Sequence, residues 1–238
     1  MIKAEGIHKT FEDFTALDNI TCNISDGCIY GMVGSNGAGK STFLRVLSGI
    51  YKPDKGCAYI DDEPIYENPK VKDNIVFVSD ELFFLPGATM SKMADFYSSI
   101  YDRFNYDRFL KLAELFELNI KKPIANFSKG MKRQASIILA LSTRAKYMFF
   151  DETFDGLDPV MRNLVKKLIC NDVAEYDTTV IVTSHSLREL EDICDHLALL
   201  HKGGLVLDSD VLELKTTQFK VQIAFKGIFG KTKFEGLN

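Results

Sequence analysis

Short apolar segments separated by turn residues fill the first 80 positions of the chain. Residues 20–24 alternate apolar and polar side chains, and after an SDG turn residues 28–33 form a continuous apolar run. This pattern predicts two β-strands. A glycine-rich segment follows at once, and apolar positions at helical spacing over residues 43–47 predict an amphipathic helix after it. Residues 75–78 predict a further strand that ends near Asp80.

The pattern changes after Asp80, where apolar side chains recur every three or four residues. Residues 93–104 and 109–116 predict two amphipathic helices. Residues 77–127 hold 11 of the chain's 27 aromatic side chains, which is enough to form a small core. We therefore interpret residues 81–135 as an inserted helical subdomain; aromatic side chains that face a partner are the alternative.

An alternation of strands and helices returns in the second half of the chain. Apolar runs at residues 147–150, 179–183 and 196–200 predict strands. Amphipathic segments around residues 160–170 and 187–194 predict the helices between them. Strands that alternate with helices in this way form a mostly parallel sheet, so the fold class is α/β.

The end of the chain differs from the rest in charge. The last 24 residues carry five lysines and one glutamate, and the alternation of apolar and polar side chains over residues 219–225 predicts a strand. We therefore place the main α/β domain at residues 1–210. Residues 211–238 form a short lysine-rich extension, which we expect to be a solvated strand.

Composition narrows the class of protein. The chain has 238 residues, of which 46% are hydrophobic and 26% charged, and its net charge of −4 argues against a general nucleic-acid partner. No apolar run approaches the roughly 18 residues of a membrane-spanning helix, and the charged first residues do not resemble a secretory signal. The five scattered cysteines favour free thiols in a reducing compartment over a metal site. These features predict a soluble intracellular chain.

The glycine-rich segment GSNGAGKS, residues 34–41, fits the phosphate-binding pattern G-x-x-x-x-G-K-[ST] and lies between a predicted strand and a predicted helix. Glycines let successive backbone N–H groups turn toward phosphate oxygens, and the N-terminus of the following helix adds a positive field. Lys40 is expected to reach the β- and γ-phosphates of a bound nucleotide, and Ser41 to ligate Mg²⁺. The predicted nucleotide-binding residues are Gly34, Ser35, Asn36, Gly37, Ala38, Gly39, Lys40, Ser41 and Thr42.

A second magnesium ligand is expected at the end of a neighbouring strand. The apolar run at residues 147–150 ends in the acidic pair Asp151 and Glu152. The Asp151 carboxylate suits the metal, and Glu152 is expected to polarise the water that attacks the γ-phosphate. An acidic pair at the end of a strand is common, and it indicates a magnesium site here only because the phosphate-binding loop is also present.

The order of these motifs resembles the ATP-binding subunit of ABC transporters, and the likeness covers about residues 1–210. The segment FSKGM, residues 127–131, is similar to the family's LSGGQ signature and keeps its serine and second glycine at Ser128 and Gly130. In the family this signature faces the ATP of a second subunit. The resemblance implies a P-loop NTPase fold with a mostly parallel core sheet, an N-terminal antiparallel β part and a helical subdomain.

Further positions match the family. Asp158 ends a segment, DGLD, that resembles the D-loop, where two subunits meet. His185 follows the predicted strand at residues 179–183 and matches the switch histidine, which contacts the γ-phosphate. Phe11 matches the aromatic side chain that stacks on adenine, and Ala16 is expected to line the same pocket.

Outside the signature, three positions depart from the family pattern. Asp80 stands where the family usually has glutamine at the entry to the helical subdomain. A carboxylate can ligate Mg²⁺ but cannot donate a hydrogen bond as an amide does, so we retain Asp80 as a candidate metal ligand. Arg133 and Gln134 reverse the usual order of these two residue types. The FSKGM signature and the acidic residue at position 80 are similar to exporter-type, ABC-2-like cassettes.

The resemblance implies a Mg²⁺-dependent ATPase that couples dimer closure to transport. The expected partners are a second ATP-binding subunit, identical or paralogous, and a separate membrane-spanning subunit that would hold the chain on the inner, cytoplasmic face of the cell membrane. A soluble iron–sulfur assembly ATPase with a single cassette is the alternative. A P-loop kinase or GTPase fits less well, because no N-K-x-D guanine-binding motif is present and the signature would be unexplained.

Overall fold

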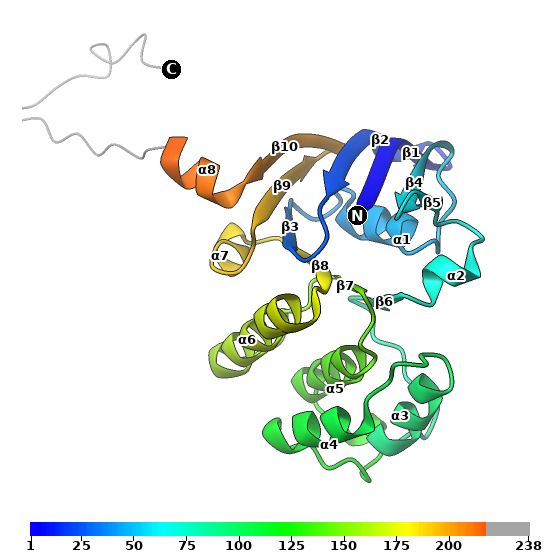
Figure 1. Ribbon diagram of the computed structural model, residues 1–238, viewed down its shortest axis with the longest axis vertical. Coiled ribbons are helices and arrows are strands. Elements are labelled where there is room, and N and C mark those ends of the chain that lie inside the picture. Colours follow the sequence, from blue (N-terminus) through cyan, green and yellow to red (C-terminus); the bar gives the residue numbers. More distant parts are fainter. Residues whose placement is uncertain (218–238) are drawn as a thin grey trace, which may run out of the picture.

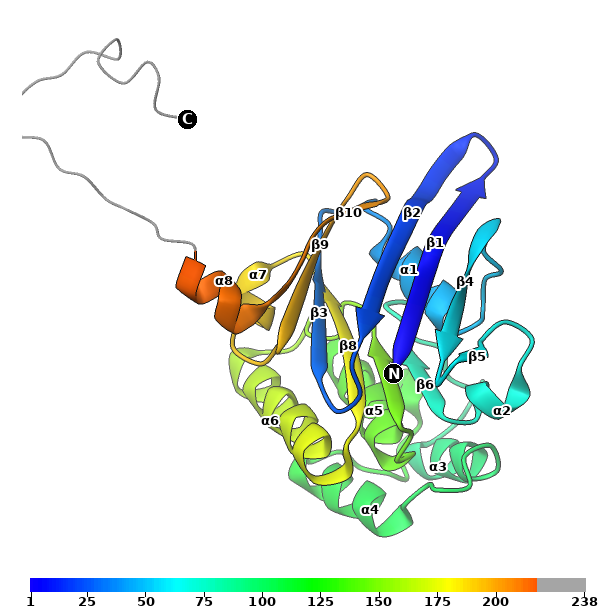
Figure 2. The ribbon, with the colours of Figure 1, turned by 45° about the horizontal axis from the view of Figure 1, so that its top comes forward.

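The computed structural model describes residues 1–217, which form two β-sheets and a group of helices (Figures 1 and 2). The strands are β1 (Ile2–Phe11), β2 (Phe14–Ile24), β3 (Ile29–Val33), β4 (Lys55–Ile60), β5 (Glu63–Pro64), β6 (Ile75–Val78), β7 (Tyr147–Phe150), β8 (Thr179–Ser184), β9 (His196–His201) and β10 (Gly204–Asp210). The helices are α1 (Lys40–Leu47), α2 (Pro69–Lys72), α3 (Met90–Ser98), α4 (Tyr106–Leu115), the 3-10 turn η1 (Ile124–Asn126), α5 (Lys129–Ser142), α6 (Pro159–Tyr176), α7 (Leu187–Leu190) and α8 (Val211–Thr217).

The central sheet has six strands in the order β10-β9-β3-β8-β7-β6. All neighbouring pairs are parallel except β10 with β9. The carboxyl ends of β3, β7 and β8 therefore lie at one edge of this sheet, where α/β proteins bind ligands. The predicted mostly parallel core sheet is confirmed.

The N-terminal part forms the second, antiparallel sheet, with the order β2-β1-β4-β5. In Figure 1 it lies with α1 at the upper right, beside β3, β9 and β10 of the central sheet, while α3 to α6 lie below. Strand β7 illustrates how the central sheet joins two cores. Met148 and Phe150 are buried in the core with α5 and α6, and Tyr147 and Phe149 are buried in the core with α1 and the antiparallel sheet. Each such side chain contributes about 1.5–3 kcal/mol by leaving water.

The segment between β6 and β7 forms a helical subdomain built on α3, α4 and α5 (Figure 1). Phe109, Phe116 and Phe127 are buried in its core, whereas Phe83 and Phe96 are exposed. The aromatic-rich segment therefore supplies both a core and surface side chains. Helix α5 begins within the predicted bounds of the subdomain, residues 81–135, and continues to Ser142.

Three predicted elements differ from the structure. Helix α3 ends at Ser98 instead of continuing to residue 104, and the hydroxyls of Ser98 and Ser99 donate to the carbonyls of Asp95 and Phe96 (2.8 and 2.7 Å). Such local hydrogen bonds compete with the helix. Helix α7 covers four residues rather than eight. The extension begins as helix α8 and not as a strand, and the strand predicted at residues 219–225 lies outside the described residues.

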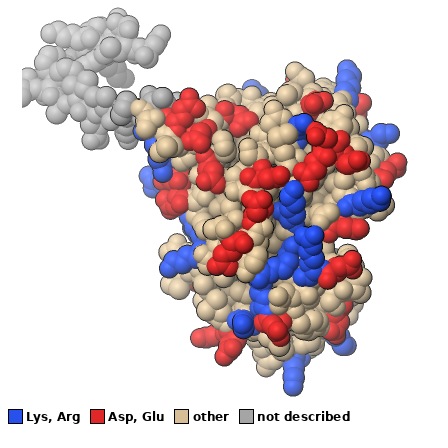
Figure 3. Space-filling view, viewed as in Figure 1, with Lys and Arg blue, Asp and Glu red and all other residues tan. Residues whose placement is uncertain are grey.

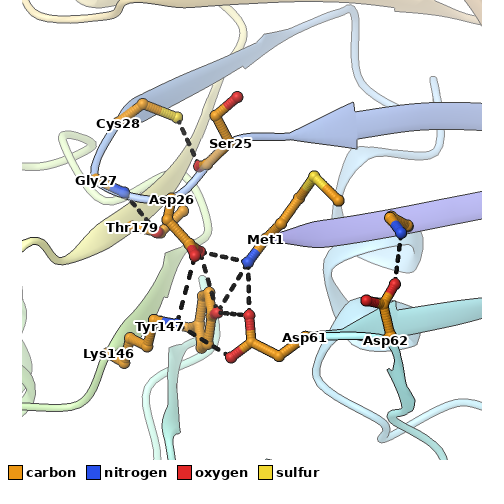
Figure 4. Close-up of polar contacts among 11 residues, drawn as sticks. Met1, Ser25, Asp26, Gly27, Cys28, Asp61, Asp62, Lys146, Tyr147 and Thr179 are labelled. Atoms are coloured by element: carbon orange, nitrogen blue, oxygen red, sulfur yellow. Dashed lines mark hydrogen bonds and ion pairs between the residues drawn. The ribbon is translucent and has the colours of Figure 1, made fainter.

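A polar cluster at the amino end of β7 links the two sheets (Figure 4). The Met1 amine, at the start of β1, lies 2.7 Å from Asp61 Oδ1 and also contacts Asp26. The Tyr147 hydroxyl lies 2.9 Å from Asp61 and 3.1 Å from Asp26, and Lys146 Nζ lies 3.0 Å from Asp61. We refer to Met1, Asp26, Asp61, Lys146 and Tyr147 as the amino-end cluster. Every charge in it has an opposite charge beside it.

The surface seen in Figure 3 carries both signs of charge: acidic side chains gather on its upper part, and a group of Lys and Arg side chains lies near its centre. All five cysteines are free thiols, as predicted. Within residues 1–217, no helix combines the length and the apolar character needed to cross a membrane.

Candidate functional site

The glycine-rich loop between β3 and α1 has the backbone shape of a phosphate cradle. Gly39 adopts a φ of 107° as the N-cap of α1, and a Cβ there would lie 2.6 Å from the carbonyl oxygen of Ala16. A Cβ on Gly34 would lie 2.6 Å from the carbonyl oxygen of Leu200. Both positions therefore require glycine.

The loop opens into a pocket of about 840 Å³ at the carboxyl edge of the central sheet. We call this pocket the cradle. Eight of the nine residues predicted for nucleotide binding line it, since Gly34 alone lies beneath its surface. The cradle is lined by Phe14, Ala16, Ser35, Asn36, Gly37, Ala38, Gly39, Lys40, Ser41, Thr42, Asp80, Glu152, Asp155 and His185.

Lys40 lies at the base of the cradle with its ammonium group enclosed by acceptors. Its side chain is 5% exposed, and Nζ donates to the carbonyl of Gly34 at 2.7 Å and contacts that of Ser35 at 3.3 Å. It also forms an ion pair of 3.1 Å with Glu152 Oε1. A compact ammonium held in this way presents a point charge to phosphate oxygens that enter the cradle.

Asp151, directly after β7, has one carboxylate oxygen in use and one without a partner. Oδ1 accepts hydrogen bonds from Ser41 Oγ (3.0 Å) and Thr183 Oγ1 (2.8 Å). Oδ2 is buried and has no hydrogen-bond partner among the described residues. Burial raises the pKa of this carboxyl, although the two hydroxyls oppose that effect. An orphaned carboxylate oxygen beside a serine hydroxyl is a donor set that suits Mg²⁺.

Glu152 and His185 lie together beside Lys40 in the cradle. Glu152 has a left-handed backbone (φ 46°), and its N–H donates to Thr183 Oγ1 at 2.9 Å. Its Oε2 lies 3.3 Å from His185 Nδ1, and Asp155 Oδ1 lies 3.9 Å from the same nitrogen. The Glu152 carboxylate is therefore aimed into the cradle between a lysine and a histidine. Sequence reasoning missed Thr183, because a threonine at a strand end carries no motif.

The aromatic side chain at the cradle is Phe14 and not the predicted Phe11. Phe11 packs edge-on against Tyr51, with ring centroids 5.3 Å apart, and is absent from the cradle lining. Phe14 is 58% exposed and does line it. The two residues are paired across the hairpin of β1 and β2. The sequence places an aromatic side chain at each end of one tight turn, and the structure engages Phe11 with Tyr51 and leaves Phe14 at the cradle.

Asp80 lines the cradle, but its carboxylate is already engaged. Its Oδ1 accepts a hydrogen bond of 2.7 Å from Nη2 of Arg133 in α5. Asp80, which the sequence indicated as a candidate metal ligand, is therefore the ion-pair partner of a guanidinium in this structure.

The signature residues do not belong to the cradle of their own chain. Ser128 caps α5, where its Oγ accepts from the N–H of Met131 (3.2 Å), and it is exposed. A Cβ on Gly130 would lie 3.0 Å from the carbonyl of Gly156, so the signature turn packs closely on the D-loop. Asp158 caps α6 by accepting from the N–H groups of Val160 and Met161 (2.9 and 3.0 Å). None of these residues lines the cradle.

Comparisons with known proteins agree with this arrangement. The family model described as ABC transporter matches residues 17–155. The chain is 32% identical to the ABC transporter ATP-binding protein YtrB of Bacillus subtilis, covering 94% of this chain and 77% of that protein. It is 30% identical to the bacitracin transport ATP-binding protein BcrA of Bacillus licheniformis, covering 87% and 68%.

The fold is also that of solved ATP-binding cassettes. A dimeric, post-hydrolysis structure of the cassette MJ0796 with ADP and phosphate superposes with a TM-score of 0.80 at 22% identity, covering 89% of this chain and 99% of that one. The relatives favour the transporter interpretation over the iron–sulfur assembly alternative. Together with the cradle and the signature turn, they show that the chain belongs to the ABC transporter family, as one of its ATP-binding, ATP-hydrolysing subunits.

Proposed function

We propose that this subunit hydrolyses ATP with Glu152 as general base and with Lys40, Ser41 and Asp151 around the phosphates and Mg²⁺. The single observation that carries the proposal is the burial of Asp151: its Oδ2 has no partner among the described residues, and its Oδ1 accepts from Ser41, which lines the cradle together with Lys40 and Glu152. A buried, unpaired carboxylate is unfavourable for folding, and a cation bound there removes the penalty. Bound Mg²⁺ would neutralise charge on the phosphate oxygens.

The chain's own side chains bind the phosphates and the adenine and accept the proton of the attacking water. Lys40 holds the β- and γ-phosphates, whose anionic oxygens replace Glu152 as its partner. Glu152 is then free to accept a proton from the attacking water, and His185, 3.3 Å away, orients it and contacts the γ-phosphate. The exposed ring of Phe14 offers a surface on which adenine stacks, beside Ala16.

We infer that the complete site needs two subunits. Ser128 is exposed and Gly130 partly exposed at the N-terminus of α5, neither lines the cradle of its own chain, and a helix N-terminus binds anions. We propose that they contact the ATP of a second subunit, with the D-loop and Asp158 at the interface. The dimeric state of the similar cassette MJ0796 supports this arrangement.

A membrane-spanning, exporter-type subunit is the proposed second partner, and it would hold the chain on the inner face of the cell membrane. The similarity to the bacitracin transport ATP-binding protein supports this choice. Co-purification from membranes tests it: a multi-span partner is expected, and recovery of the chain with iron–sulfur assembly proteins instead would contradict it.

Replacing Glu152 tests the catalytic proposal. Glu152→Gln should lower ATP turnover by a factor of about 10²–10⁴, the usual contribution of a positioned general base, while ATP binding is retained. Light scattering after size exclusion should show an ATP-dependent dimer that persists. Glu189→Gln is a matched control, because Glu189 is as buried as Glu152 (14% and 13% exposed) and also ion-paired, yet lies outside the cradle. Near wild-type turnover in Glu152→Gln would exclude Glu152 as the base.

Replacing the two hairpin aromatics tests the adenine site. Phe14→Ala should weaken ATP binding about tenfold, within the range of roughly 1–3 kcal/mol for stacking of a base on an aromatic ring. Phe11→Ala, at the other end of the same turn, should change the affinity less than about twofold. Titration with a fluorescent ATP analogue measures both. If Phe11→Ala weakened ATP binding more than Phe14→Ala does, the adenine would be assigned to Phe11 instead.

A further inference from the structure

Two carboxylates and a histidine converge in the cradle. His185 Nδ1 lies 3.3 Å from Glu152 Oε2 and 3.9 Å from Asp155 Oδ1. These three ligand atoms all lie within 4.8 Å of one another. Within residues 1–217, this is the one group of three or more His, Cys, Asp or Glu side chains that is arranged so closely. We refer to Glu152, Asp155 and His185 as the triad.

Backbone hydrogen bonds hold the members of the triad together. The two carboxylates belong to one turn, in which the Asp155 N–H donates to the carbonyl of Glu152 at 3.1 Å. The Glu152 N–H donates to Thr183 Oγ1 at 2.9 Å, two residues before His185. The buried side chains of Phe154 and Thr183 anchor the turn and the end of β8 in the core. The fold therefore brings the three ligand atoms together before any ligand arrives.

The spacing of these atoms suits a small divalent cation. Zn²⁺ binds imidazole nitrogen and carboxylate oxygen at about 2.0–2.2 Å, so two ligands of a tetrahedral Zn²⁺ lie about 3.3–3.6 Å apart. Glu152 and His185 already have that separation. Asp155 needs to approach His185 by only about 0.5 Å to reach it. The Asp155 side chain is 41% exposed, so it has room to turn.

The triad offers different donor atoms from the proposed Mg²⁺ site. Ser41 and Asp151 present only oxygen, which Mg²⁺ prefers, whereas the triad adds an imidazole nitrogen, which favours Zn²⁺ and related transition-metal ions. Lys40 Nζ occupies the other oxygen of Glu152, Oε1, at 3.1 Å, so Oε2 is the oxygen left for a metal ion. The nearby ammonium opposes a second cation and keeps the affinity moderate.

We propose that, before nucleotide binds, the triad takes up a transition-metal dication of the Zn²⁺ class, and that this metal ion inhibits ATP turnover by holding Glu152 and His185. The inhibition rests on the proposed function, since it withdraws the general base and the histidine of the same site. The metal ion takes the lone pair of His185 Nδ1, and the neutral imidazole keeps its proton on Nε2. A Glu152 carboxylate bound to the metal ion no longer accepts a proton from water.

Cobalt absorption of the nucleotide-free chain tests the metal site. Co²⁺ alone is the probe, because it takes the ligands of Zn²⁺ and gives a visible spectrum. The spectrum should saturate, disappear when Zn²⁺ is added and survive an about 100-fold excess of Mg²⁺, for which imidazole is a poor ligand. His185→Gln and Asp155→Asn should each weaken Co²⁺ binding by at least about tenfold, since even the outer partners of metal ligands are worth roughly 10–100-fold. Both variants should fold, because these side chains are 51% and 41% exposed.

His8, in β1, offers a matched control. Its Nδ1 lies 3.3 Å from Asp18 Oδ1, the same distance as between His185 and Glu152. Among residues 1–217, however, His8 belongs to no group of three metal-ligating side chains. His8→Gln should therefore bind Co²⁺ within about twofold of the wild type. This comparison separates a site of three ligands from a simple pair of histidine and carboxylate.

Inhibition of turnover is the second readout. Free Zn²⁺, set by a chelator buffer, should inhibit Mg²⁺–ATP turnover of the wild type and of His8→Gln. At ATP concentrations below KM, half inhibition should occur within about threefold of the Zn²⁺ dissociation constant obtained by competition with Co²⁺. A zinc-selective chelator should restore turnover.

The outcomes separate this inference from the proposed function. If no saturable Co²⁺ spectrum forms, if Mg²⁺ displaces Co²⁺, or if His185→Gln binds Co²⁺ as tightly as His8→Gln does, the metal site is refuted and the ATPase proposal stands. If Co²⁺ binds to the triad but the wild type does not hydrolyse ATP, the proposed function fails and the metal site stands. Half inhibition at more than about ten times the dissociation constant would refute the inhibitory role.

Discussion

The two ends of strand β7 carry two clusters of charge with opposite properties. At its amino end, Tyr147 joins the amino-end cluster, in which each carboxylate contacts a cation (Figure 4). At its carboxyl end, Asp151 is buried with an oxygen that has no hydrogen-bond partner within residues 1–217. The intervening residues are fully buried, so the strand holds both ends rigidly.

The pKa values at the two ends shift in opposite directions. Burial alone would raise the pKa of Asp61, but hydrogen bonds from the Met1 amine, Lys146 and Tyr147 outweigh burial and lower it to about 2. At Asp151, burial prevails over the hydrogen bonds and raises the pKa. The amino-end cluster satisfies its charges internally and so stabilises the fold. The cradle leaves a charge unsatisfied, which is the property that a site for a cation and phosphates requires.

The largest expected difference between the two ends concerns their lysines. Lys40→Ala should weaken ATP binding by roughly 100-fold or more, because two or more charged hydrogen bonds to phosphate are lost at about 1.5–3 kcal/mol each. Lys146→Ala removes a lysine at the other end of β7 and should leave the affinity within about twofold. A titration with a fluorescent ATP analogue measures both. An unchanged affinity in Lys40→Ala would contradict the assignment of the cradle.

A smaller effect is expected for the stability of the cradle. In the absence of nucleotide and Mg²⁺, Asp151→Asn should raise the melting temperature by about 2–4 °C, since removing the charge from a buried carboxylate is worth about 1 kcal/mol in a domain of this size. Mg²⁺-dependent turnover should be lost in the same variant. Thermal unfolding by calorimetry gives the first quantity. A lower melting temperature would show that the carboxylate of Asp151 stabilises the fold.

The smallest effect is expected at the amino-end cluster. Asp61→Asn should lower the free energy of unfolding by about 1 kcal/mol at pH 7, a value reduced for solvent screening because Asp61 is half exposed. Its folded pKa lies below the unfolded value near 3.9, so its stabilisation is present above about pH 4 and is lost as the pH falls toward 2. Urea titrations between pH 7 and pH 3 should show that the difference in unfolding free energy between the variant and the wild type becomes smaller as the pH falls. A difference in unfolding free energy that does not depend on pH would contradict the ion-pair origin of the stabilisation. ATP turnover of the variant should be unchanged.

The sequence predicted the elements that carry strong local patterns. The glycine loop, the buried strand that ends in Asp151 and the helical subdomain were all visible, because period, glycine placement and motif order are local properties. The prediction was wrong at two element boundaries. Helix α3 stops at Ser98, and residues 211–217 form a helix that Asp210 caps by accepting from the N–H groups of Leu212 and Glu213. These local hydrogen bonds are weaker signals than the periodicity of the apolar side chains. At the cradle, the sequence did not indicate that Phe14, and not Phe11, lines the pocket.

By itself, the sequence determined that this chain is an α/β nucleotide-binding protein, because only certain residue types permit a tight phosphate-binding loop and an acidic strand end. Only the tertiary structure decided how the charges are matched. It placed Thr183 on Asp151, left one oxygen of that carboxylate without a partner in the described part of the chain, and joined Asp80 to Arg133 across 53 positions. The physical reason is that burial and pairing set the energy of a charge, and both depend on neighbours that are distant in the sequence.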